Sequence, residues 1–412
     1  MEFYIHKDLT GLKDHLLCQP EDGSVKFVHD VPGRPLFFGE EEIIEVAKVY
    51  GLSLPSFPPR NYVKAARTVL GNSDVSQVPW KLMVPRKAYI ESIHTLGKDL
   101  VEVFKGIDFE YYQRYYKRTL PLLGKMRRCK IDPIAYKHHS MNQEKSPHLE
   151  SFHPKEDGYA SDLVYSKCDT VTGRLKVLSG PNILHLFKSE RNVIASRFGT
   201  NGRIWQLDYK SLEPRTILGI NNSSSGLLFG NPPQDIYSHV LKELHLTDIS
   251  RDAVKQVVIT QLYGAGYDTI LEKLTGVPNP QDFITAVNSW FGVDALRDKL
   301  LQEYEQANRE FIHSFYGRRV NTTQAKPYML INRFIQSTAV DIALMGFDSI
   351  VRHVESQGLM DFIVPIFILH DALFLDVHKD YESEFTELSD VGSKNIPLFP
   401  GFQFPIKPEQ LI

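Results

Sequence analysis

The sequence predicts an α+β fold built around an antiparallel hairpin, and three observations support this prediction. In the stretch Phe367-Ile-Leu-His-Asp-Ala-Leu-Phe-Leu-Asp-Val377, apolar β-formers stand on both sides of His370-Asp371, a pattern typical of two strands joined by a tight turn. Far upstream, Arg203-Ile-Trp-Gln-Leu-Asp208-Tyr209 is a second strand-like run, and it also ends near an aspartate. Apolar residues at helical spacing predict helices elsewhere, among them residues 40–49, 88–104, 212–220, 251–263 and 332–352.

Asp208 and Asp371 are the first candidate site residues. A single aspartate in a turn commonly serves local turn chemistry, and that interpretation stays open for each residue taken alone. Two carboxylates at the ends of two strands can, however, share hard cations through oxygen ligands, as Mg²⁺ prefers. Such a pair is the minimum that two-metal phosphoryl transfer requires.

Composition places the chain among ordinary globular proteins. It has 412 residues, a formal net charge of −3, 42% hydrophobic residues and 24% charged residues, enough for several subdomains with their own cores. Three cysteines, Cys18, Cys129 and Cys168, are odd in number and show no metal-ligand spacing, which favours a reducing cytoplasm. The first residues are too polar and acidic for a signal peptide, and no apolar run approaches the roughly 20 residues of a membrane span. We therefore expect a cytoplasmic protein without a membrane partner.

The helix expected from residue 251 to 263 carries an unusual stripe. Its four-residue repeat places these side chains on one face: Arg251, Lys255, Ile259 and Tyr263. Two cations buried in a core would lack partners, whereas this order suits a helix that holds a triphosphate at its start and a base at its far end. A surface helix with two solvated cations is the alternative. Ser250 is expected to cap the helix and Gly264 to end it.

The segment from Arg114 to Lys130 contains seven basic residues and no acidic one. Four tyrosines precede or interleave with these cations: Tyr111, Tyr112, Tyr115 and Tyr116. One interpretation is a solvated helix face, and the other is a surface that follows phosphates with aromatic platforms for bases. Residues 140–158 are polar and aperiodic, so we expect a loop there.

Six motifs, in family order, resemble the polymerase region of family A DNA polymerases, the bacterial DNA polymerase I type. The major three resemble a first palm motif, a fingers helix and a His-Asp turn: Asp208-Tyr-Lys-Ser-Leu-Glu-Pro-Arg215, Arg251-x-x-x-Lys255-x-x-x-Ile259-x-x-x-Tyr263-Gly264 and Leu369-His-Asp-Ala372. The minor three are Thr172-Gly-Arg-Leu175 with Pro181-Asn182, Phe315-Tyr-Gly-Arg-Arg319 and Asn332-x-x-x-Gln336-x-Thr-Ala339. The resemblance covers about residues 120–380. It implies a right-hand polymerase with an antiparallel-sheet palm, helical fingers, a reduced thumb and a small N-terminal region.

The resemblance also implies a role for each matching residue. Asp208, Asp371 and the backbone carbonyl of Tyr209 would hold two Mg²⁺ ions, for which Mn²⁺ would substitute. Asp208, Asp371 and Lys255 would be the catalytic residues. The nucleotide would be bound by Arg251, Lys255, Ile259, Tyr263, Glu213 and His239, with Glu213 walling off the sugar 2′ position. DNA would be bound by Arg174, Asn182, Asn332, Gln336 and His370; the minor groove that some of these would touch presents acceptors common to all base pairs. Apart from the resemblance, the basic stretch offers three further candidates for DNA binding: Arg127, Arg128 and Lys130.

The chain also departs from the family. Ala372 stands where the family has a third acidic residue, and Ile259 stands where Phe or Tyr is usual. Barely forty residues separate Asp132 from Arg174, too few for the long helical pair of the family's thumb. The only Asp-x-Glu in the first third is Asp108-Phe-Glu110, and the region is too short for a proofreading exonuclease. We therefore expect a compact, phage-like polymerase without proofreading.

The expected parts are an N-terminal region of unknown role (1–118), a connector and reduced thumb (119–160), palm (161–230), fingers (231–310) and palm again (311–412). Expected partners are primer–template DNA and deoxynucleoside triphosphates, with a processivity factor or a separate exonuclease as further candidates.

Two alternatives to a DNA polymerase stay open. One is a catalytically inactive nucleic-acid-binding protein of polymerase descent, which Ala372 keeps in view. The other is a single-subunit RNA polymerase, against which Glu213 argues because that family leaves room for the 2′-hydroxyl.

Overall fold

The computed structural model describes residues 1–31, 33, 35–71, 75, 78–142, 146–225, 235–265, 267–274, 276–394 and 396–411. It divides into two compact units, Met1–Arg114 and Tyr115–Ile412. The finer division into connector, palm and fingers stays a prediction. Its boundary between residues 230 and 231 lies outside the described residues.

Unit 1 is a small sheet covered by helices. Its strands β1 (Phe3–Ile5), β2 (His15–Gln19), β3 (Ser24–Val28) and β4 (Phe37–Phe38) lie in the order β3-β2-β1-β4, and β1 and β4 are parallel. The helices are α1 (Lys7–Thr10), α2 (Glu40–Val49), α3 (Arg60–Leu70), α4 (Trp80–Met83) and α5 (Arg86–Val103). Four fully buried rings, Phe3, Phe38, Phe104 and Phe109, pack edge-on or tilted against one another and form the centre of this core.

The sheet of unit 2 has four antiparallel strands in the order β12-β13-β9-β14. They are β9 (Gly202–Tyr209), β12 (Ile363–Leu369), β13 (Ala372–His378) and β14 (Ile406–Gln410). The hairpin predicted around His370-Asp371 is confirmed as β12 and β13, and the strand predicted to carry Asp208 is confirmed as β9. β12 and β13 are buried along nearly their whole length, as expected from the continuous apolar runs on both sides of the turn.

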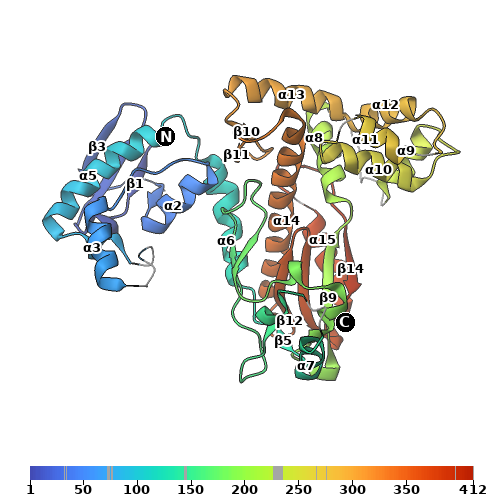
Figure 1. The fold of residues 1–412 in the computed structure, drawn as a ribbon, viewed down its shortest axis with the longest axis horizontal. Helices are drawn as coiled ribbons and strands as arrows, with labels where there is room; N and C mark the ends of the chain where they lie inside the picture. Colours follow the sequence, from blue (N-terminus) through green and yellow to red (C-terminus); the bar gives the residue numbers. More distant parts are fainter. Residues whose placement is uncertain are drawn as a thin grey trace. The chain divides into compact units, whose positions relative to one another are not determined.

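The long helix α14 (Leu330–Ser356) packs against α6 (Lys117–Gly124), α8 (Leu212–Ser225) and α15 (Phe385–Ser393) (Figure 1). Among the described residues, Pro327–Ser356 is the one segment long and apolar enough to cross a membrane by length and composition, although the sequence was expected to hold no such run. The most apolar 18-residue stretch of this segment is 94% buried inside the fold. A buried core helix meets the same criteria, so the segment is weak evidence for a membrane.

A group of helices separate from the strands of the sheet is drawn in yellow to orange in Figure 1. It comprises α9 (Ile236–Glu243), α10 (Arg251–Leu262), α11 (Tyr267–Lys273), α12 (Pro280–Phe291) and α13 (Val293–Gln306). α10 packs against α8, α9, α11 and α12. Its predicted ends are confirmed: the Ser250 hydroxyl accepts from Ala253 N at 3.2 Å, and Gly264 follows at φ +77°. α8 runs to Ser225, beyond the predicted end at residue 220.

The remaining strands of unit 2 form three short pairs: β5 (Lys130–Ile131) with β8 (Ile194–Ala195), β6 (Val164–Ser166) with β7 (Lys176–Ser179), and β10 (Phe311–His313) with β11 (Arg319–Asn321). Between α6 and β6, the longest helix among the described residues is α7 (Pro133–Ser140), which has eight residues. A hydrophobic core joins this part of the chain to the β12–β13 hairpin. It contains Ile131, Phe152 and Ile183 together with Phe367 and Phe374 of the hairpin.

The four tyrosines expected as aromatic platforms are interior residues. Tyr111, Tyr112, Tyr115 and Tyr116 are all buried. The Tyr112 hydroxyl donates to Glu45 at 3.0 Å, and the Tyr115 ring lies 4.8 Å from the ring of Tyr316. The interpretation of these rings as stacking surfaces is therefore wrong, because their faces pack against protein.

Candidate active site

The register of the sheet brings Asp208 and Asp371 together. Asp208 lies near the end of β9, where its neighbour on β13 is Ala372 and its neighbour on β14 is Lys407. Asp371 lies in the turn just before Ala372, and its carbonyl accepts a hydrogen bond from Tyr209 N at 3.0 Å. Two aspartates 163 positions apart in the chain thus lie at one end of neighbouring strands.

Both turns beside the carboxylates contain a residue in the left-handed region. His370 has φ +55° and Ser211, in the turn from β9 to α8, has φ +51°. Neither is glycine, so each conformation costs on the order of 1–2 kcal/mol. Non-glycine residues in such conformations are enriched at functional sites, and both of these residues line the cavity described next.

A cavity of about 390 Å³ opens over the carboxylates. Ten of the residues predicted for the site line it: Arg174, Asp208, Tyr209, Glu213, Lys255, Ile259, Tyr263, Gln336, His370 and Asp371. The cavity wall therefore combines the end of the sheet with three residues of the α10 stripe and with Gln336, Ala339 and Val340 of α14. This grouping joins segments that lie up to 197 positions apart in the chain.

The carboxylates share an environment that disfavours their ionised form. Burial, the neighbouring Asp371 and Glu409 raise the pKa of Asp208 to about 7, against a smaller opposing effect of Lys407. Burial also raises the pKa of Asp371. Lys407 does little to compensate because its Nζ pairs with Glu409 on the same strand. An added cation between the two aspartates would stabilise their charged forms.

Glu213 and Arg174 form an ion pair inside the cavity, with Nη2 and Oε1 2.9 Å apart. Burial raises the pKa of Glu213, and Asp371 adds to this effect while Arg174 opposes it. Arg174 follows Gly173, whose φ is +76° and whose α-carbon faces Arg318: an added Cβ would lie 2.4 Å from Arg318 Nη1. The turn that presents Arg174 therefore requires glycine at position 173.

The segment that presents Arg174 is fixed by a buried ion pair that the sequence analysis missed. Lys167 Nζ lies 3.0 Å from Asp341 Oδ1 of α14, and both side chains are at most 1% exposed. Lys167 Nζ also donates to Thr119 Oγ1 at 2.9 Å and lies 4.9 Å from the centre of the Tyr116 ring. The signal for this pair was an aspartate inside an apolar helix, since a buried charge needs a partner.

Tyr237 is a second residue that the sequence analysis missed. It lines the cavity, whereas His239, two positions later on α9, does not. His239 lies 3.9 Å from Glu243 and packs against Trp290. Tyr237 is buried, and its phenol hydrogen-bonds to Ser211.

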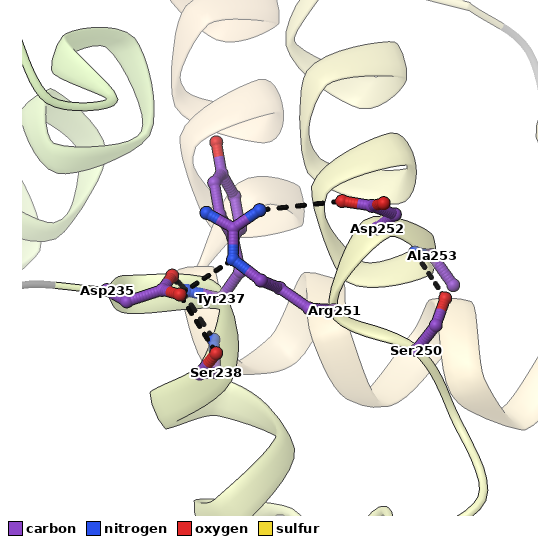
Figure 2. A network of polar contacts seen from close by, with 7 residues as sticks. All are labelled: Asp235, Tyr237, Ser238, Ser250, Arg251, Asp252 and Ala253. Carbon is purple, nitrogen blue, oxygen red and sulfur yellow. Dashed lines mark hydrogen bonds and ion pairs between the residues drawn. The ribbon is translucent and has the colours of Figure 1, made fainter.

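Several predicted residues do not line the cavity: Arg251, His239, Asn182, Asn332, Arg127, Arg128 and Lys130. Arg251 lies one turn before Lys255 and pairs with Asp235 and Asp252 (Figure 2). Asn332 is half-buried one helical turn before Gln336. Asn182 has a buried Oδ1 without a hydrogen-bond partner among the described residues.

The basic segment is partly neutralised. Arg128 pairs with Asp157 at 2.6 Å and donates from Nε to Ala160 O at 2.6 Å, so it fixes the loop at residues 157–160. Lys125 pairs with Glu355. Arg127 is exposed and Lys130 half-buried. Their proposed contacts with DNA stay a prediction.

Comparison with known proteins supports the fold. No family model matches the chain, and no curated protein matches its sequence. Among solved structures, the chain is similar to the POL domain of Pol1 from M. smegmatis in complex with a DNA primer-template and dNTP. The alignment covers 97% of this chain and 92% of that one, with a TM-score of 0.53 and 12% identity. The chain therefore has the α+β fold of a polymerase domain.

Proposed function

We propose that the protein is a template-dependent DNA polymerase that adds deoxynucleotides to a primer 3′-hydroxyl. The observation that carries this proposal is the cavity itself. Asp208 and Asp371 line it together with Lys255, Ile259 and Tyr263 of the α10 stripe, and these residue types suit metal ligation and triphosphate binding in nucleotidyl transfer. The fold likeness to a polymerase domain supports the same conclusion. Membership of family A rests on the six sequence motifs.

The two carboxylates fit divalent cations. They are oxygen ligands, the Asp371 charge disfavours ionisation of Asp208, and burial raises the pKa of both carboxyls despite the cations among their neighbours. The described residues contain no group of three or more His, Cys, Asp or Glu suited to a metal, so protein ligands would come from this pair and backbone atoms such as the Tyr209 carbonyl. Two Mg²⁺ or Mn²⁺ ions there would activate the primer hydroxyl and neutralise the triphosphate and pyrophosphate.

The remaining cavity residues have distinct proposed roles. The exposed Lys255 ammonium binds phosphate oxygens, and the half-exposed Tyr263 ring stacks near the templating base. Glu213, held by Arg174, closes the space beside the sugar 2′ position. Gln336 and Arg174 supply donors for the minor groove at the primer end.

The proposed enzyme lacks proofreading. Asp108 accepts from Glu110 N at 2.9 Å and Glu110 pairs with Arg114 at 2.7 Å, so both carboxylates of Asp108-Phe-Glu110 have local partners. The eight-residue α7 is too short for the helical pair that grips DNA in the family. We therefore propose a distributive enzyme of phage-like, compact type, acting in the cytoplasm with a clamp or separate exonuclease as partner.

Primer extension tests the proposal. The wild type should extend a labelled primer with deoxynucleotides in Mg²⁺ or Mn²⁺ and use ribonucleotides poorly. Asp208→Asn and Asp371→Asn should each abolish extension while primer–template binding persists, because each removes a metal ligand and no phosphate contact. Efficient ribonucleotide use would favour an RNA polymerase. Absence of any extension by a protein that binds DNA would favour an inactive nucleic-acid-binding protein.

A further inference from the structure

Arg251 is held at the edge of the cavity and does not line it. Its Nε donates to Asp235 Oδ2 at 2.6 Å, and its Nη1 lies 3.5 Å from Asp252 Oδ1. The guanidinium carbon lies 5.1 Å from the centre of the Tyr237 ring (Figure 2). The ring and one carboxylate therefore fix the position of the guanidinium.

Asp235 is oriented by a second set of hydrogen bonds because it also caps α9. Its Oδ1 accepts from Tyr237 N at 3.1 Å and from Ser238 N at 3.4 Å, and its Oδ2 accepts from the Ser238 hydroxyl at 2.9 Å. Burial by itself would raise the pKa of Asp235, but the hydrogen bonds from Arg251 and Ser238 outweigh it and lower the pKa below its usual value. The carboxylate is thus ionised at neutral pH, when it attracts Arg251 most strongly.

Arg251 is adjacent to two residues that line the cavity. Lys255, four residues later on the same face of α10, lines the cavity, and so does Tyr237, on whose ring the guanidinium lies. Residues four apart on a helix are about 6 Å apart. An anion that reaches Lys255 and extends toward the start of α10 therefore approaches the Arg251 guanidinium on the side of Tyr237.

We propose that Asp235 is a positioning residue that holds Arg251 over Tyr237 until the polyphosphate of an incoming nucleotide displaces it. The inference rests on the proposed function, since it assigns the competing anion to a nucleoside triphosphate. In this exchange the Arg251 guanidinium leaves the Asp235 carboxylate and binds phosphate oxygens. Asp235 keeps its three hydrogen bonds within α9. The Asp235 carboxylate therefore lowers nucleotide affinity and makes it sensitive to the charge of the ligand.

The expected effect is small because the pair is exposed: the two side chains are 45% and 41% accessible. Exposed ion pairs contribute about 0.2–1 kcal/mol, equivalent to about a 1.5- to 5-fold change in affinity. Asp235→Asn is the informative variant. Asparagine caps helices as well as aspartate does, so the charge is lost while the cap is kept.

The experiment measures equilibrium binding of a non-hydrolysable deoxynucleoside triphosphate to protein bound to a dideoxy-terminated primer–template in Mg²⁺. Asp235→Asn should tighten binding about 1.5- to 5-fold, and the gain should disappear in an Arg251→Ala background. Asp252→Asn is the matched control. That carboxylate is 88% exposed and at the limit of hydrogen-bonding distance, so its removal should change affinity less.

The outcomes separate the two proposals. If the wild type binds no triphosphate, the proposed function fails and the exchange fails with it. If the wild type binds but Asp235→Asn leaves the affinity unchanged, weakens it, or tightens it equally without Arg251, the exchange is wrong and the proposed function stands. A merely structural role for Asp235 would weaken binding, which is the opposite of the expected direction.

Discussion

Asp208→Asn should make the metal-free protein more stable at pH 8, even though it removes a proposed metal ligand. Folding raises the pKa of this carboxyl from 3.8 to about 7, because burial and Asp371 disfavour its charged form. The folded state therefore prefers the protonated group. The cost of ionising Asp208 is absent below about pH 3.8, grows as the pH rises toward 7, and is complete above it.

The size of this cost follows from the two pKa values. Their difference corresponds to about 4 kcal/mol. Asp208 is partly exposed, so solvent screening reduces the contribution to about 2 kcal/mol. The neutral amide of asparagine keeps the shape and removes the charge. Asp208→Asn should thus gain about 2 kcal/mol at pH 8, and less than half of that at pH 5, where the folded carboxyl of the wild type is mostly protonated.

Urea unfolding in EDTA, followed by tryptophan fluorescence, measures this difference. Trp205 lies on β9, next to the strand end that carries Asp208, and Trp290 lies in the same unit. Adding Mg²⁺ at ten times its dissociation constant should stabilise the wild type by about 1.4 kcal/mol and leave Asp208→Asn unchanged. Asp361→Asn is the control, because Asp361 is an exposed aspartate before β12. This change should leave the free energy of unfolding the same at both pH values. A variant no more stable than the wild type at pH 8 would refute the reasoning.

Three further predictions concern other parts of the site. Glu213→Ala should raise the ratio of ribonucleotide to deoxynucleotide incorporation in primer extension, because it opens the space beside the sugar; an unchanged ratio would place that selection elsewhere. Lys255→Ala should weaken nucleotide binding by about 1.5–3 kcal/mol, the usual contribution of a charge-assisted phosphate contact, without changing DNA affinity in a gel-shift assay. Asp341→Asn should destabilise the protein to urea by about 3–5 kcal/mol, because Lys167 stays buried without its counter-charge. Replacing both residues by methionine and leucine should cost less than the single change, and equal losses would contradict this account.

The strands of the site could be predicted because they are local patterns. Runs of apolar β-forming residues on both sides of His370-Asp371 and a strand-like run before Asp208 predict two strand ends with carboxylates, and the structure confirms both elements. The register that sets Ala372 and Lys407 beside Asp208 could not be predicted, since it depends on pairing between distant segments. The effect of Lys407 and Glu409 on the pKa of Asp208 could therefore not be inferred from the sequence.

The direction of individual side chains could not be predicted from the sequence either. Tyr111 to Tyr116 lie among cations in the sequence, yet their rings fill cores, because a large aromatic gains more from burial than from exposure beside charges. On α9, the candidate residue was His239, whereas the cavity is lined by Tyr237. A two-residue difference on a helix turns a side chain by about half a circle, and only the packing of α9 against α10 decides which residue faces the cavity.

The central position of β9 sets the order in which this site can assemble. One edge of the strand pairs with residues 372–378 and the other with residues 406–410, so the first edge stays open until residue 378 has been made and the second until residue 410 has been made. At 5–20 residues per second, the ribosome needs about 10–40 s to reach β14 after completing β9. During that time β9 has at least one unpaired edge, a form that chaperones recognise and that aggregates readily. Yield in a heterologous host should therefore depend on growth temperature and chaperone supply more than on the stability of the finished protein.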